Sequence, residues 1–247
     1  PELLFLNFID RGYCAYDCLS SKPKIVRYWG EACKIYEKNN LITKKPNYYY
    51  AKICIELLNY KLKEARITIM EAIRIIETKE EGTYYYTYFK QRYLFCLITS
   101  FLLDSIENKK QIEDYFSQVE KLNYIQNKKM GYSIHWLKSI FYFLTKQYQD
   151  SIINIEDAIN LLQESKKKTF CDIYLDQLYG NAEYVFAKYM INNNFSLNLN
   201  QLNNHMLIKK LNKIMQMSNS ELLKFINTHK ATGLLQTIDQ KISFPVL

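Results

Sequence analysis

Turn-forming residues are scarce in this chain of 247 residues, which contains only six glycines and four prolines. A protein built mainly of β-hairpins needs many tight turns, and glycine and proline are the residues that form such turns most readily. Hydrophobic residues nevertheless make up 48% of the chain, which is enough for a sizeable core at this length. The composition therefore favours an all-α fold.

Residues typical of catalytic and metal sites are also few. The three histidines are far apart in the sequence: His135, His205 and His229. No two of them have the spacing of metal ligands on one helix, and the isolated glycines form neither a P-loop nor a dinucleotide-binding fingerprint. The carboxylate pairs Glu156–Asp157 and Glu113–Asp114 are expected on outward, solvated faces of their helices. We therefore expect no enzymatic activity, no metal site and no cofactor.

Long hydrophobic runs are absent as well. The longest uninterrupted one, residues 93–99, is far shorter than the roughly 20 residues needed to cross a bilayer. Residues 3–9 lack the basic leader of a secretory signal. The six cysteines are scattered through apolar helical segments, as expected of reduced core residues: Cys14, Cys18, Cys33, Cys54, Cys96 and Cys171. We expect a cytoplasmic protein without membrane contacts.

The formal net charge of +8 is spread along the chain. Residues 1–200 carry 27 Lys and Arg against 23 Asp and Glu, and residues 201–247 carry 6 against 2. Such a diffuse excess suits a solvated surface better than a groove that follows a phosphate backbone. Nucleic acid is therefore expected as a partner only through a domain missing from this chain.

Apolar residues recur every three or four positions in blocks of helical length, which predicts about nine or ten helices. Helix-capping and helix-breaking residues separate the blocks. One block begins at Pro23, which follows a pair of serines, and ends at Asn39–Asn40. Glu80–Gly82 separates two further helices, and 192–200 is a polar loop. We predict paired helices over residues 1–195 and C-terminal capping helices with a tail over 196–247.

The segment 139–159 resembles one unit of the tetratricopeptide repeat family. Its small, aromatic and bulky residues match that family's packing positions: Ser139, Tyr142, Tyr148, Ser151, Ile155 and Ala158. Small residues let two helices approach until bulky neighbours fill the grooves between them. The resemblance implies a right-handed superhelical stack of helix hairpins. Such a solenoid typically binds peptides or proteins along a concave face.

Two other segments match the family in part. Residues 50–72 fit if the turn between their helices is one residue shorter, and 178–184 carries Gly180 and Ala182 at consensus positions. The repeat between these two segments departs from the family pattern, because Ile112 and Val119 stand where the family has small residues. The spacing between successive repeats also exceeds the family's usual 34 residues.

The resemblance places one face of each first helix in a peptide-binding groove. Carried over position by position, that face holds eight residues: Ser133, Trp136, Ile140, Phe143, Tyr174, Gln177, Asn181 and Tyr184. Asn181 is the foremost candidate, since a carboxamide both donates to and accepts from a peptide backbone. A core position for Trp136 and Phe143 remains the alternative, as does a structural hydrogen bond for Asn181.

A second resemblance involves residues 131–145 and the hairpin that follows. They look like the C-terminal sensor domain of peptide-responsive transcriptional regulators of the Rgg and PrgX type. That function would need an upstream helix-turn-helix, and residues 1–40 do not show one. The chain begins with Pro1 rather than Met, so we expect it to be a fragment or a processed form. The expected partner is a protein or peptide, and a homodimer stays open. The basic helix near Lys209 is expected to cap the stack, with membrane-surface binding as the alternative.

Overall fold

The computed structural model describes residues 1–17, 21–41, 44–59, 61–77, 84–104, 109–122, 131–164, 171–192 and 198–228. The chain divides into two compact units, residues 1–100 and 101–247. Across the described ranges the regular elements are eleven α-helices and one 3-10 helix, which confirms the all-α prediction. The number of helices in these ranges is slightly above the expected nine or ten. The boundary expected at residue 195 lies within the second unit and stays a prediction.

The first unit consists of helices joined in sequence, each packed on the next from α1 to α4. Their bounds are α1 (Glu2–Asp17), α2 (Lys22–Asn39), α3 (Lys45–Leu58), α4 (Leu62–Glu77) and α5 (Tyr84–Asp104), of which α5 ends beyond the unit. The start and end of α2 follow the local sequence as expected. A proline lies in its first turn, and Asn40 ends it with a left-handed backbone at φ 47°.

Aromatic rings fill the core of this unit. The side chain of Trp29 is wholly buried against α1, where Gly12 lets the helices approach closely. A Cβ atom on Gly12 would lie 2.2 Å from the indole Nε1 of Trp29, so no larger residue fits without displacing the ring. Tyr50 of α3 contacts Tyr13 and Tyr88, with ring centroids 4.8 and 4.5 Å away.

The cysteines of this unit differ in their surroundings. Cys54 and Cys96 are buried as predicted, and the Cys54 thiol lies 3.3 Å from the hydroxyl of Tyr88. Burial raises the pKa of the Cys33 and Cys96 thiols to about 12, so both are unreactive at neutral pH. The core prediction is wrong for Cys14, which is exposed because it lies on the outer face of α1. Cys18 and the side chain of Cys171 lie outside the described residues.

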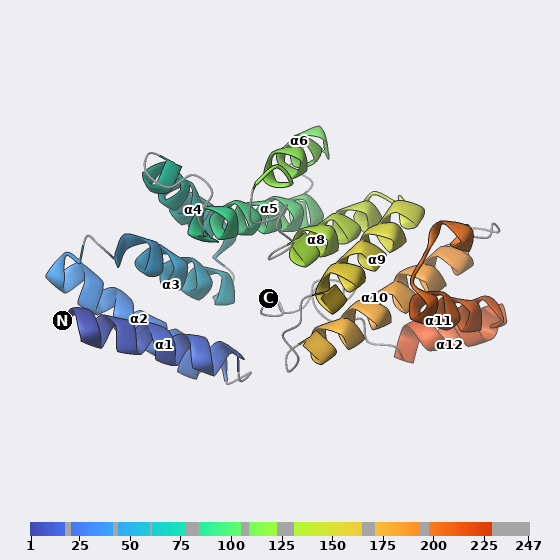
Figure 1. The fold of residues 1–247 in the computed structure, drawn as a ribbon, viewed down its shortest axis with the longest axis horizontal. Coiled ribbons are helices and arrows are strands. Elements are labelled where there is room, and N and C mark those ends of the chain that lie inside the picture. Colours follow the sequence, from blue (N-terminus) through green and yellow to red (C-terminus); the bar gives the residue numbers. More distant parts are fainter. Residues whose placement is uncertain are drawn as a thin grey trace. The chain divides into compact units, whose positions relative to one another are not determined.

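The second unit contains the end of α5 and six further helices. They are α6 (Lys109–Val119), α8 (Gly131–Leu144), α9 (Tyr148–Glu164), α10 (Cys171–Asn192), α11 (His205–Met215) and α12 (Asn219–Thr228). Helices α8, α9 and α10 lie side by side, and α11 and α12 pack on α10 (Figure 1). That α11 and α12 cap a stack of repeats stays a prediction.

Small residues form the contact between α8 and α9, as the sequence predicts. Ser139, Ser151 and Ala158 are all buried, with at most 1% of their surface exposed. The Ser151 hydroxyl donates a hydrogen bond of 2.8 Å to the main-chain carbonyl of Ser139. Such a bond requires the helix backbones to lie very close, which only small side chains permit.

A buried carboxylate holds the start of α11. Glu156 is only 3% exposed, and its Oε1 accepts hydrogen bonds from the main-chain N–H groups of Asn203 and Asn204, at 2.6 and 2.5 Å. The Asn204 side chain in turn caps α11 by accepting from the N–H of Leu207. The solvated position expected for Glu156 is therefore wrong, because α9 turns this carboxylate toward the segment that enters α11.

The apolar face of α11 is also buried, through Leu207, Leu211 and Ile214. Its Lys210 lies 3.7 Å from the carboxylate of Glu183 on α10. None of the described helices combines the length and the apolar content that a bilayer crossing requires.

Candidate functional site

Helix α8 presents three faces with different neighbours. His135 and Ser139 face α9, whereas Phe141 packs on Phe116 of α6, with ring centroids 5.8 Å apart. The third face carries the four predicted groove residues: Ser133, Trp136, Ile140 and Phe143. Because successive residues turn by 100° around a helix, the spacing of these four keeps them on one side.

The four α8 positions differ in exposure. Ile140 is wholly buried, Trp136 is 8% exposed and Ser133 is 9% exposed. Phe143, at the C-terminal end of the helix, is partly exposed. A ligand that approaches this face therefore meets Phe143 before it meets the other three.

The predicted α10 positions follow the same pattern. Asn181 and Tyr184 are each 1% exposed, and Gln177 is partly exposed. The side chain of Tyr174 lies outside the described residues. The structure brings the two predicted faces together at Phe143 and Tyr184, whose ring centroids are 6.4 Å apart.

A cluster of aromatic side chains surrounds this meeting point. Tyr148, at the start of α9, contacts Phe143 with ring centroids 5.8 Å apart, and it contacts Tyr189 of α10 at 5.5 Å. Lys188 places its Nζ 5.4 Å from the ring centroid of Tyr184. We call Phe143, Tyr148, Tyr184, Tyr189 and Lys188 the aromatic ledge. Phe143, Tyr148, Lys188 and Tyr189 are all partly exposed.

The ledge offers a distinct kind of recognition surface. Aromatic rings provide a large apolar contact area at a low cost in side-chain entropy. A peptide with an apolar or aromatic side chain matches that chemistry. The sequence interpretation missed Tyr189 and Lys188, because three helices bring these groups together and no local spacing signals it.

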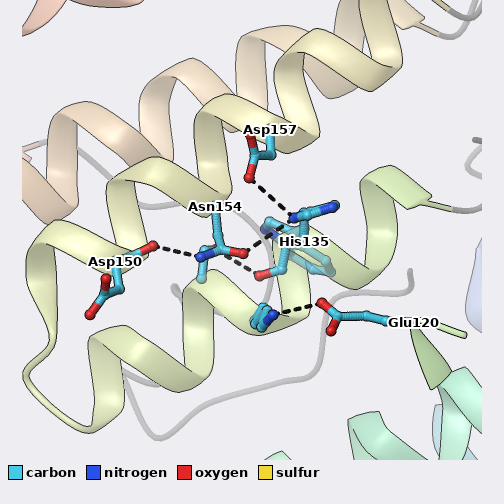
Figure 2. Close-up of polar contacts among 8 residues, drawn as sticks. Glu120, His135, Asp150, Asn154 and Asp157 are labelled. Atoms are coloured by element: carbon cyan, nitrogen blue, oxygen red, sulfur yellow. Dashed lines mark hydrogen bonds and ion pairs between the residues drawn. The ribbon is translucent and has the colours of Figure 1, made fainter. Parts of the chain in front are cut away.

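A polar cluster lies on the face of α8 that packs against α9 (Figure 2). The Nδ1 atom of His135 is 3.2 Å from Oδ1 of Asn154 and 3.5 Å from Oδ2 of Asp157, both on α9. The Asn154 amide donates to the main-chain carbonyl of Asp150 at 2.8 Å. Since a carbonyl only accepts, this bond fixes the amide orientation and leaves Oδ1 facing the imidazole. Nδ1 of His135 therefore carries a hydrogen.

This polar cluster joins helices. Lys138, also on α8, places its Nζ 2.6 Å from the Glu120 carboxylate, which follows α6. Among the described residues, no serine, threonine or cysteine contacts the His135 imidazole, so none is placed as a nucleophile for an acid–base pair of His135 with Asp157. Nor do three or more His, Cys, Asp or Glu side chains gather as a metal site anywhere in the described ranges. The cluster links α6 and α9 to α8, and so fixes the rotation of α8 that turns Phe143 toward the other ledge residues.

Comparison of the chain with protein-family models, with curated proteins and with solved structures finds no match.

Proposed function

We propose that the protein is a non-catalytic helical-repeat adaptor that binds a peptide or protein segment, and that the aromatic ledge is the contact surface. The observation that carries this proposal is the partly exposed ring cluster at the junction of α8, α9 and α10. The ledge includes two of the positions expected from the tetratricopeptide resemblance, Phe143 and Tyr184. The proposed scaffold is a superhelical stack of hairpins, in which first helices such as α8 and α10 contribute adjacent parts of one inner face.

The proposed ligand contacts differ from the buried part of the predicted groove. Asn181 and Ile140 are buried, so their proposed role is to support the ledge rings from within the core. Phe143, Tyr189 and Gln177 supply accessible surface. A ligand segment with one apolar anchor would cover the rings.

The test is capture from an extract of the native cells, with mass spectrometry of both proteins and small peptides. We expect Phe143→Ala and Tyr189→Ala to reduce capture of the same partner at least tenfold, because truncation of a hot-spot aromatic residue costs about 2 kcal/mol or more and tenfold corresponds to about 1.4 kcal/mol. Tyr142→Ala is the matched control: it removes a partly exposed ring from the same helix, on a side away from the ledge. If Phe143→Ala and the control capture equally well while helical circular dichroism is unchanged, the ledge is not the binding surface.

A further inference from the structure

The outer face of α4, in the first unit, carries two large apolar side chains that the fold leaves uncovered. Ile67 is 70% exposed and Met70 is 51% exposed. They are three residues apart, so they lie next to each other on the helix surface. The opposite side of α4 is well packed, with Ala65, Ile69 and Ala72 wholly buried. The exposure is thus a property of one face of a firmly docked helix.

Positive charges flank this apolar pair at both ends. Lys63 precedes Ile67 by four residues, and Arg74 follows Met70 by four. Both cations are exposed, and neither forms an ion pair within the described part of the chain. At about 1.5 Å of rise per residue, the two charges lie roughly 16 Å apart along the helix. Lys63, Ile67, Met70 and Arg74 therefore form one continuous stripe, which we call the α4 stripe.

The charges of the α4 stripe disfavour a second copy of the chain as its partner. A two-fold antiparallel pairing that matched Ile67 with Met70 would place Lys63 against Arg74 of the other copy. A parallel two-fold pairing would place each cation against itself. Glu71, beside the stripe, is turned toward α3, where its carboxylate accepts a hydrogen bond of 2.8 Å from the Tyr49 hydroxyl. Like charges in direct opposition destabilise helix pairs.

The same charges favour an acidic partner. A helix with two apolar residues on one face, and a carboxylate about one turn beyond each of them, would cover Ile67 and Met70 while its acids reached Lys63 and Arg74. Helix-on-helix contact is also the packing mode that α4 already uses with α3. We propose that the α4 stripe docks a helix of a partner protein whose apolar pair is flanked at both ends by Asp or Glu. This site is separate from the aromatic ledge and does not depend on it.

The probe is a synthetic 18-residue helical peptide with two leucines three residues apart and glutamates four residues outside them. Its counterpart has lysines in place of those glutamates. Fluorescence anisotropy with the full chain should show at least tenfold tighter binding of the glutamate peptide. Ile67→Glu should weaken that binding at least tenfold, since it removes the apolar contact and adds a repelling charge. Leu3→Glu, at an 84% exposed position of α1, is the matched control and should leave binding unchanged.

The decisive variant combines Lys63→Glu with Arg74→Glu. Both side chains are exposed, so helicity should be preserved, and the preference should reverse in favour of the lysine peptide. Absence of binding by both peptides, binding that Ile67→Glu does not alter, or an unreversed preference would each overturn the proposal. A dimer that sedimentation detects and Ile67→Glu abolishes would also overturn it in favour of a second copy. Phe143→Ala should leave peptide binding intact, which separates failure here from failure of the aromatic ledge.

Discussion

Removing the Glu156 carboxylate should loosen α11 from the rest of the second unit. The carboxylate accepts two main-chain N–H bonds from residues 47 and 48 positions later in the chain. A hydrogen bond to a charged group contributes about 1.5–3 kcal/mol, and the low end applies here because Asn203 is exposed and water can replace part of the loss. Glu156→Ala should therefore lower the free energy of unfolding by about 2–4 kcal/mol. Glu156→Gln keeps an acceptor oxygen for both N–H groups but loses the negative charge, and so should cost about half as much.

Two measurements check this prediction. Urea denaturation followed by circular dichroism gives the global loss, and native-state hydrogen exchange should show that the amides of α11 lose protection first. Asp157→Ala is the control, since it removes the adjacent carboxylate, which is 47% exposed and 3.5 Å from His135. A half-exposed pair of this kind contributes at most about 1 kcal/mol. Equal losses from the two alanine variants, with α11 protection unchanged, would refute the role given to Glu156.

Three further substitutions test the packing and charge of individual helices. Gly12→Ala should lower the melting temperature, because the added Cβ would clash with Trp29 and overpacking costs about 1–3 kcal/mol. Gly30→Ala should raise the melting temperature, because no atom lies within 4 Å of the added Cβ and alanine favours the helix more than glycine does. Ser151→Val should cost a similar 1–3 kcal/mol in urea denaturation by forcing apart two close helices. Burial raises the pKa of Glu56, so its protonated form is favoured in the folded state. That contribution is complete below the unfolded pKa of about 4.3 and is lost as pH rises through the folded pKa. Glu56→Gln should therefore gain stability relative to the wild type as pH rises from 4 to 7, and a constant difference would contradict the assignment.

Local signals in the sequence predicted much of the helical framework. A proline in the first turn and an asparagine at the end define α2, and Asn40 takes the left-handed backbone that asparagine tolerates well. The same holds for the contact of α8 with α9, where the small residues Ser139 and Ser151 are buried as expected. These features depend on residues close together in sequence, so the periodicity of apolar residues and the residues that begin or end helices are sufficient to predict them.

Contacts between distant segments could not be predicted in this way. Glu156 and Asp157 are neighbours with the same chemistry, yet one is 3% exposed and binds the start of α11 while the other is half-exposed beside His135. A turn of 100° between successive residues separates them, and only the packing of α9 decides which one faces inward. The aromatic ledge is a further case, because Tyr148 and Tyr189 meet only after α9 and α10 have packed.

The burial of the predicted groove also determines which variants can report on binding. Trp136 and Asn181 are enclosed by protein, so Trp136→Ala or Asn181→Ala would leave a cavity or an unpaired polar partner and lower stability by about 1–5 kcal/mol. A loss of binding in either variant would then have two causes that a capture assay cannot separate. Phe143 is partly exposed at the end of the same helix face, so its truncation removes ligand contact area with less loss of core packing. An effect of Phe143→Ala on capture, without a matching change in the urea midpoint, is therefore the observation that distinguishes a ligand contact from a structural one.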